Sequence, residues 1–255
     1  MTIAAKRLQD NFSRAAGRYD AHAWLQRQQV ARVLATAQQY LPAQARIADI
    51  GCGTGFFAAE ARALQPAWHI TGIDYAYDMA REAAIHCAAV VQGNGAQLPL
   101  ADASVDGVVS SLCLQWVGDK AAMLAETRRV LKPGGTAIIM TLGNETLEEL
   151  QDAVRRSDMP LGLLAMESFD TYRALAKASG MQVLACQRTR EIHHYASVES
   201  LLVSMRSIGA GNAGEKQFIA PKKFAKLIQQ YEAMHGTKRG IPATWEPILM
   251  VMKNV

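Results

Sequence analysis

Cysteine is scarce in this sequence, and its cysteines stand too far apart to form a recognisable pair. They are Cys52, Cys87, Cys113 and Cys186. Zinc sites and disulfide frameworks both need cysteines at short or repeated spacings, so the sequence predicts neither. We interpret these residues as reduced thiols, because nothing beside them in the sequence indicates an activated nucleophile.

Long apolar runs are also missing. No run approaches the roughly 18 residues that cross a bilayer, and residues 1–10 lack the apolar stretch of a signal peptide. The sequence contains no internal repeat and no low-complexity tract. We therefore expect a cytoplasmic protein that binds no metal and whose partners include neither a membrane nor a nucleic acid.

The chain is long and apolar enough for one large domain with a substantial core. It has 255 residues, of which 50% are hydrophobic, and a net charge of +4. The charge is uneven along the chain. Residues 1–46 carry seven basic and two acidic side chains, and residues 197–255 carry eight basic and four acidic ones. Residues 47–196, in contrast, carry twelve basic and seventeen acidic side chains. Positive flanks on an acidic centre indicate either an acidic substrate or partner, or simply a solvated basic surface.

Three alternate glycines follow the first predicted strand, residues 46–50. Gly51, Gly53 and Gly55 have no Cβ atom, so the backbone can approach a ligand closely, and the next residues read as a helix whose N-terminus faces that ligand. The spacing differs from the dinucleotide fingerprint, in which the third glycine comes three residues after the second. Asp49, directly before the first glycine, can accept a hydrogen bond from a cationic amine. The pattern therefore favours S-adenosylmethionine (SAM) over NAD.

A second acidic residue ends the next predicted strand. The apolar run 68–73 leads into Asp74, and an acidic residue at this place typically holds ribose hydroxyls. Two further strands are predicted to end near residues 95 and 111, so that several strand ends line one crevice. Asp74 could otherwise be an ordinary surface acid at a strand terminus.

Helices and strands alternate along most of the chain. Further helices are predicted at 76–89, 119–130, 146–156 and 168–179, and further strands at 136–142, 181–195 and 244–252. This order predicts an α/β fold with a doubly wound, seven-stranded, mostly parallel sheet. We expect a single domain with a helical arm at 1–42, a core at 43–196, a helical lid at 197–240 inserted between the last two strands, and the last strand within 241–255.

Two helical segments are predicted to cover the crevice. In the arm, Tyr19, His22 and Gln26 lie at helical spacing on one face, although they could instead be packing residues. In the lid, two helices are joined by the glycine-rich residues 209–214. The segment 110–117 is too apolar for an exposed loop and is predicted to line a pocket.

The combined features resemble class I SAM-dependent methyltransferases over essentially the whole chain. Within that class, four segments are similar to the malonyl-acyl-carrier-protein O-methyltransferases of biotin synthesis. These segments are residues 11–23 with Gln26, 110–116, 146–150 and 208–210. The first of them also resembles quinone-type methyltransferases.

This resemblance implies a cofactor site and a substrate site. SAM, with S-adenosylhomocysteine as its product, would be bound by residues at the strand ends: Asp49, Gly51, Gly53, Gly55, Asp74, Tyr75, Met79, Asn94, Gly95 and Leu112. Asp74 would hold the ribose, and Asn94 would meet the adenine where such enzymes more usually have Asp. The substrate would be bound by Tyr19, His22, Gln115, Trp116 and Arg206. Arg206 is the candidate cation beside the substrate carboxylate, with a solvated surface arginine as the alternative.

The implied reaction is methyl transfer from SAM to the free carboxylate of a malonyl group on acyl carrier protein, or on CoA. The ester would start the pimeloyl part of biotin. We expect no catalytic acid or base, because a carboxylic acid with a pKa near 4 is already ionised at neutral pH. Two alternatives stay open: a methyltransferase acting on a quinone precursor or another small acid, and a nucleotide-binding protein without catalysis.

Overall fold

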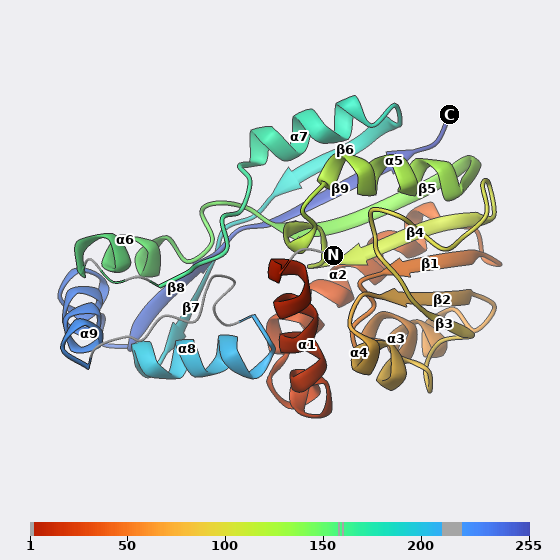
Figure 1. Ribbon diagram of the computed structural model, residues 1–255. Coiled ribbons are helices and arrows are strands. Elements are labelled where there is room, and N and C mark those ends of the chain that lie inside the picture. The colour runs from red at the N-terminus through yellow and green to blue at the C-terminus, as the bar shows by residue number, and fades with distance from the viewer. Residues whose placement is uncertain (1–2, 158, 160, 211–220) are drawn as a thin grey trace.

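The computed structural model describes residues 3–157, 159, 161–210 and 221–255 of the chain (Figure 1). The strands are β1 (Arg46–Ile50), β2 (His69–Asp74), β3 (Ala89–Gln92), β4 (Val105–Ser111), β5 (Leu131–Leu142), β6 (Gln182–Arg188), β7 (Glu191–Tyr195), β8 (Ile241–Trp245) and β9 (Pro247–Lys253). The helices are α1 (Ile3–His22), α2 (Trp24–Tyr40), α3 (Phe56–Leu64), α4 (Tyr77–Ala83), α5 (Lys120–Val130), α6 (Glu148–Ser157), α7 (Phe169–Ala178), α8 (Val198–Ser207) and α9 (Pro221–His235). A short 3-10 helix, η1 (Leu114–Trp116), follows β4.

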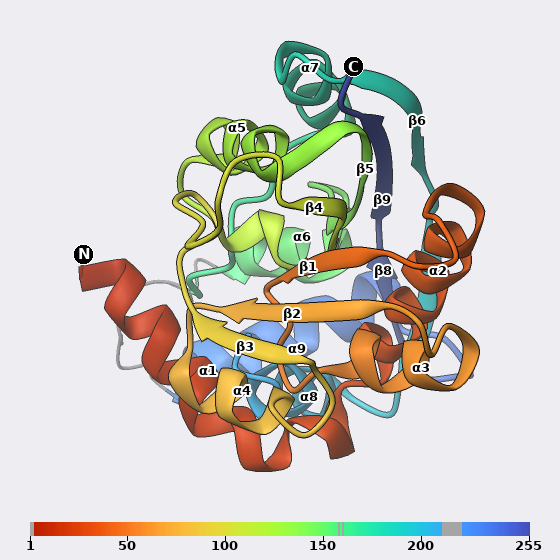
Figure 2. The same ribbon diagram turned by 90° about the vertical axis from the view of Figure 1, so that its right-hand side faces the viewer.

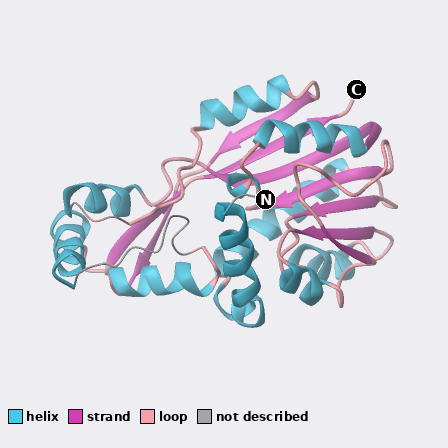
Figure 3. Ribbon diagram, in the orientation of Figure 1, coloured by secondary structure: helices cyan, strands magenta, loops and turns pink. Residues whose placement is uncertain are grey.

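The larger of two sheets has seven strands in the order β3-β2-β1-β4-β5-β9-β6, and the smaller sheet pairs β7 with β8 (Figures 2 and 3). Within the larger sheet, neighbours from β3 to β5 are parallel, and β9 is antiparallel to β5 and to β6. The predicted α/β fold with a seven-stranded, mostly parallel sheet is therefore confirmed.

Helices cover both faces of the larger sheet because alternate side chains of a strand point to opposite faces. On β5, Ile138 and Met140 pack into one apolar cluster with α2 and α3, whereas Ala137 and Ile139 pack into another with α5 and α7. The strand is buried on both faces, as expected for a central strand of such a sheet. Among the helices described, none combines the length and the apolar character that a membrane span requires.

Two predicted strands are each divided in two, which corrects the predicted boundaries. The run 181–195 forms β6 and β7, and the run 244–252 forms the end of β8 and most of β9. Glu246 lies at the second division with its side chain 1% exposed, and its carboxylate accepts hydrogen bonds from Glu145 N at 2.9 Å and Arg188 Nη1 at 3.2 Å. A buried carboxylate is costly unless it is hydrogen-bonded, so Glu246 stays beside these two donors. The chain passes from the smaller sheet to the larger sheet at this residue.

Two other boundaries also differ from those predicted. Helix α4 ends at Ala83 rather than near residue 89. Ala84 N and His86 N there donate to carbonyls only three residues back, Arg81 O and Ala83 O, and the chain turns toward β3. Strand β5 begins at Leu131 rather than residue 136, since Leu131 already pairs with Val105 ahead of a register shift. The predicted N-cap of α5 is present: Asp119 Oδ1 accepts from Ala122 N at 2.8 Å.

The sheet of β7 and β8 and helices α6, α8 and α9 form a lobe beside the larger sheet (left in Figure 1). Helix α1 lies between this lobe and the larger sheet, in contact with α8 on one side and α4 on the other. Helices α8 and α9 lie between β7 and β8 in the chain. Most of the predicted glycine-rich connection, residues 211–214, lies outside the described residues.

Candidate active site

The glycine turn connects β1 to α3 at the carboxyl edge of the larger sheet. Its backbone is held by β2, because Gly51 N and Cys52 N donate hydrogen bonds to Ile73 O at 2.7 and 3.2 Å. Gly51 has a φ of 72°, in the left-handed region, and a Cβ atom on it would lie 2.4 Å from Cys113 Cβ. A side chain is therefore excluded at position 51, and the backbone of the turn forms one wall of a cavity.

Asp74, the last residue of β2, is tied to the same turn. Its Oδ2 accepts from Gly53 N at 2.9 Å and its Oδ1 accepts from Ala76 N at 2.8 Å. Burial raises the pKa of this carboxyl from 3.8 to about 6, although the two backbone hydrogen bonds act in the opposite direction. The carboxylate is thus oriented by the backbone and lines the cavity.

This first cavity has a volume of about 490 Å³ and lies over the ends of the parallel strands. Of the residues predicted to bind the cofactor, it is lined by Gly51, Gly53, Asp74, Tyr75, Met79, Asn94, Gly95 and Leu112. The structure thus brings together residues that are more than 60 positions apart in the chain. Ser111 and Cys113, from the segment 110–117 that was predicted to line a pocket, also lie in the wall. The sequence analysis missed several other lining residues: Leu8, Gln9, Phe12, Ile50 and Ile73.

Two predicted cofactor residues do not line the cavity. Gly55 is the N-cap of α3 with a φ of 90°, and a Cβ atom on it would lie 3.1 Å from Ala83 Cα. The absence of a side chain at Gly55 allows close packing against α4, and its contact with a ligand stays a prediction. Asp49 lies beneath the turn, 3% exposed, and its Oδ2 has no hydrogen-bond partner in the described part of the chain.

Burial, reinforced by the negative charge of Asp74, raises the pKa of Asp49 from 3.8 to about 7. Below pH 4 the carboxyl is protonated in both the folded and the unfolded chain. Between pH 4 and 7 only the folded chain keeps the proton, so the free energy of unfolding falls as the pH rises. Above pH 7 the folded chain carries the full cost of a buried charge.

We therefore expect Asp49→Asn to gain stability relative to the parent protein as the pH rises from 5 to 8. The pH-dependent gain should be on the order of a few kcal/mol, since one pKa unit corresponds to about 1.4 kcal/mol. Urea unfolding at both pH values measures it, and any constant cost of the new amide cancels between the two. An equal difference between the two proteins at pH 5 and pH 8 would contradict the assignment.

Helix α1 forms the roof of the first cavity. Gln9 Nε2 donates to Tyr75 O at 2.9 Å, and Thr54 Oγ1, in the glycine turn, donates to Asp20 Oδ1 at 2.7 Å. Between these two attachments, Phe12 and Tyr19 lie against the cavity. Burial and the nearby Asp74 raise the pKa of the Tyr19 hydroxyl, which therefore stays protonated.

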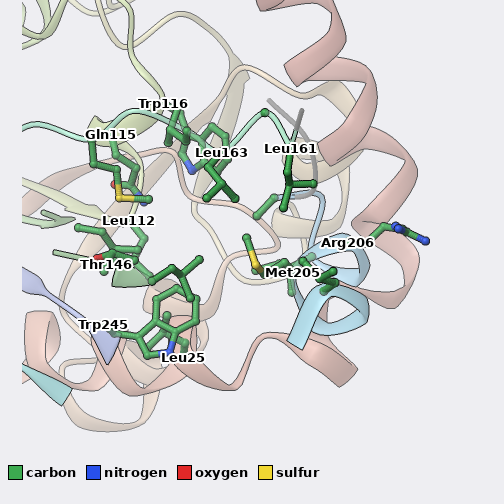
Figure 4. A pocket seen from close by; sticks show the side chains of 18 of the residues that line it. Leu25, Leu112, Gln115, Trp116, Thr146, Leu161, Leu163, Met205, Arg206 and Trp245 are labelled. Carbon is green, nitrogen blue, oxygen red and sulfur yellow. The ribbon is translucent and has the colours of Figure 1, made fainter. Parts of the chain in front are cut away.

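A second cavity, of about 240 Å³, adjoins the first and extends into the lobe (Figure 4). Its walls are mainly leucine, methionine and aromatic side chains from η1, α2, α6, α8, β8 and residues 161–166. Five residues line both cavities, and we call them the shared wall: Phe12, Tyr19, Leu112, Trp116 and Leu164. The rings of Phe12 and Trp116 meet edge to face, with centroids 5.4 Å apart.

The predicted substrate residues divide into three groups. Gln115, Trp116 and Tyr19 line the second cavity, as does Gln26, which lies on α2 and not on the same helix as Tyr19. His22 is exposed at the end of α1, where the chain bends at Ala23, and it lines neither cavity; its contact with substrate stays a prediction. Arg206 is at the edge of the cavity, but its guanidinium points away from it (Figure 4).

Comparisons with known proteins show the family of this chain. The family described as a methyltransferase domain matches residues 48–139. The malonyl-[acyl-carrier protein] O-methyltransferase of Dechloromonas aromatica is 32% identical over 252 residues, which are 97% of this chain and 94% of that protein. The corresponding protein of Herminiimonas arsenicoxydans is 36% identical over 246 residues, 95% and 94% of the two chains. The bifunctional biotin biosynthesis protein BioHC of Cellvibrio japonicus is 33% identical over 258 residues, 98% of this chain but 50% of that protein.

Solved structures show the same fold. A SAM-dependent methyltransferase of Thermotoga maritima has a TM-score of 0.56 and 19% identity, covering 97% of this chain and 100% of its own. An N-methyltransferase of Haemonchus contortus in complex with S-adenosylhomocysteine has a TM-score of 0.53 and 19% identity, covering 87% of this chain and 52% of its own. Fold and site together define a SAM-dependent methyltransferase. The chain belongs to the family of malonyl-[acyl-carrier protein] O-methyltransferases.

Proposed function

We propose that the chain transfers a methyl group from SAM to the free carboxylate of a malonyl thioester carried on acyl carrier protein. The observation that carries this proposal is the pair of adjoining cavities, one with polar groups at strand ends and one mainly apolar, with a shared wall between them. Relatives that match almost the whole chain are named for this activity. The product would be the malonyl methyl ester that starts the pimeloyl part of biotin.

The lining of the first cavity fits SAM by its chemistry. Asp74 would accept hydrogen bonds from the ribose hydroxyls, since each of its oxygens keeps a lone pair beyond the bond it already accepts. Asn94 and Gly95 would meet the adenine; Asn94 Oδ1 accepts from Ala96 N at 3.0 Å, which leaves its Nδ2 group for the base. The buried carboxylate of Asp49, whose Oδ2 has no partner in the described part of the chain, would favour the cationic amine of the cofactor.

Three further parts of the cavity complete the fit. Gly51 and Gly53 would allow the methionine part to lie close to the backbone. Tyr75, Met79 and Leu112 would pack against the adenosyl group. When bound, SAM supplies an electrophilic methyl group on a positively charged sulfur.

The residues of the second cavity would orient the acceptor and exclude water. No proton has to be removed, because the acceptor carboxylate is already ionised at neutral pH. Apolar side chains such as Leu25, Leu163 and Met205 surround the cavity (Figure 4). Since the reaction consumes a negative and a positive charge and yields neutral products, apolar surroundings favour it more than water does. Positioning and desolvation are therefore the work proposed for this site.

A carrier protein as partner is supported by charges outside the second cavity. Arg206 is exposed, and on α9 both Lys222 and Lys226 are exposed near Phe224, which lines the cavity. Acyl carrier proteins are strongly acidic, so these cations would steer the carrier to the cavity. This revises the predicted role of Arg206 from holding the carboxylate to meeting the carrier surface.

Mass spectrometry of malonyl-carrier incubated with SAM and the purified protein tests the proposed function. We expect the mass of the loaded carrier to rise by one CH₂ unit, and we expect the free carrier to stay unmethylated. Malonyl-CoA, a quinone precursor and small dicarboxylic acids serve as competing acceptors. Methylation of one of these with no change in malonyl-carrier would replace the proposal with a small-molecule methyltransferase.

Arg206→Ala should lower kcat/KM for malonyl-carrier by about 2- to 10-fold, because one steering charge is lost. The value for malonyl-pantetheine, which lacks the phosphates of CoA, and the affinity for SAM should not change. Raising salt from low to physiological strength should also reduce kcat/KM much more for the carrier than for malonyl-pantetheine. Arg239→Ala, which removes an exposed cation elsewhere in the lobe, is the matched control. Equal salt dependence for both acceptors would show that the exposed cations are only a solvated surface.

A further inference from the structure

Gln115 stands apart from the other polar residues of the second cavity. It lies in η1, between Leu112 and Trp116 of the shared wall on one side and the interior of the sheet on the other. Its side chain is 4% exposed overall, although it lines the cavity (Figure 4). Burying an amide is costly unless its polar atoms have partners, so its position calls for an explanation.

One end of this amide is fixed from behind. Thr141, a fully buried residue of β5, donates a hydrogen bond from Oγ1 to Gln115 Oε1 at 2.9 Å, and the same hydroxyl lies 3.4 Å from the Tyr172 hydroxyl. The Nε2 group of Gln115 donates no hydrogen bond within the described part of the chain, and it is not among the buried unpartnered atoms. The acceptor end therefore faces the sheet, and the donor end is left for the cavity.

Among the amide and guanidinium side chains of the described residues on this cavity, Gln115 alone combines burial with a fixed, unused donor. Gln151 Nε2 already donates to Asn144 O at 3.1 Å and to Thr146 O at 2.8 Å. Arg206 points away from the cavity (Figure 4). Gln26 has no described partner that would orient its amide. The cavity thus offers an oriented neutral donor at the shared wall.

We propose that Gln115 Nε2 donates a hydrogen bond to the carboxylate oxygen of the methyl acceptor and that Thr141 is the positioning residue that sets its direction. The proposal rests on the proposed function and adds to it the group that recognises the carboxylate. It also defines the acceptor class as carboxylates: a hydrogen-bond donor fits an ionised oxygen, whereas an acceptor such as Glu would repel it.

A neutral donor suits this reaction better than a cation. The carboxylate loses its negative charge as it is methylated, so a cation beside it would stabilise the starting ion pair more than the transition state. A cation would also repel the positive sulfur of the cofactor. An amide holds the oxygen in place, in a mainly apolar cavity, without neutralising it.

Substitutions at both residues test the proposal. Gln115→Leu and Gln115→Glu should both lower kcat/KM for malonyl-carrier by roughly 10- to 100-fold, because a hydrogen bond to a charged group is lost. The loss should be larger for Gln115→Glu, because this substitution also places a negative charge beside the carboxylate. Thr141→Val should lower it by about 3- to 10-fold, and Thr141→Ser, which keeps the hydroxyl, should restore most of the parent value. Gln28→Leu, at an exposed glutamine of α2 that lines neither cavity, is the control and should change kcat/KM by less than about 3-fold.

Binding provides a readout separate from turnover. In calorimetry with malonyl-pantetheine and saturating S-adenosylhomocysteine, Gln115→Glu should weaken the thioester by roughly 10-fold or more and leave the affinity for S-adenosylhomocysteine unchanged. Parent-level kcat/KM in Gln115→Leu, or equal losses in Thr141→Val and Thr141→Ser, would overturn the proposal while the function stood. Failure of the parent protein to methylate malonyl-carrier would overturn the proposed function, and this inference with it.

Discussion

Asp74→Ala should weaken the binding of SAM by one or two charge-assisted hydrogen bonds, each worth about 1.5–3 kcal/mol. The carboxylate is held in place by Gly53 N and Ala76 N before any ligand arrives, so little ordering is needed on binding. Calorimetry with SAM and with S-adenosylhomocysteine measures the loss. Both ligands should be affected equally, because the ribose is common to them.

A neighbouring carboxylate provides the control for this experiment. Asp78 lies in the first turn of α4, pairs with Arg81 at 3.0 Å, and does not line the first cavity. Asp78→Ala should therefore bind SAM like the parent protein. Asp74→Asn removes the charge but keeps a side-chain oxygen that can accept from the backbone N–H groups. Comparing its SAM affinity with that of Asp74→Ala therefore separates the effect of the lost charge from that of a loosened turn. Unchanged SAM affinity in Asp74→Ala would remove this residue from the site.

Deleting residues 1–22 should abolish turnover and leave the larger sheet folded. Helix α1 supplies part of the wall of the first cavity and two members of the shared wall, so its loss opens both cavities to water. Its own packing is against α4 and α8, whereas α2 packs on α3, β4 and β5. The core beneath α2 should therefore survive the deletion, which circular dichroism and thermal unfolding can verify.

A pair of point variants separates the position of α1 from its mere presence. Thr54→Val removes the 2.7 Å hydrogen bond to Asp20 at nearly constant volume, and Thr54→Ser keeps a hydroxyl there. We expect a lower kcat in the first and a value close to the parent's in the second. Turnover at the parent rate in the truncated protein would show that α1 is not part of the active site.

The sequence allowed the cofactor half of the fold to be predicted, because its signals are local. An apolar run followed by alternate glycines, and an acid at the end of the next strand, depend on few distant contacts. The division of 181–195 into β6 and β7 could not be predicted in this way. The run 181–195 contains no glycine or proline that would mark the break. The place where the chain changes sheet depends on the burial of Glu246 among segments distant in sequence.

The same distinction applies to the site residues. Asp74 and Asn94 lie where their strands end, which the order of the elements predicts. The break between α1 and α2 at Ala23, next to His22, could not be predicted because no strong helix-ending residue marks it. Gln9, Phe12 and Tyr19 do fall at a helical spacing, and that pattern could have revealed the roof of the first cavity. The direction of Arg206 depends on the packing of α8 and has no signal in the sequence.

The shared wall also has a consequence for inhibitor design. Because the two cavities meet at Phe12, Tyr19, Leu112, Trp116 and Leu164, fragments found separately for each could be joined by a short linker without crossing bulk solvent. A joined compound gives up its translational freedom once instead of twice, so its affinity can exceed that of either fragment by orders of magnitude. A linker that keeps Phe12 and Trp116 in edge-to-face contact would lose least of that advantage.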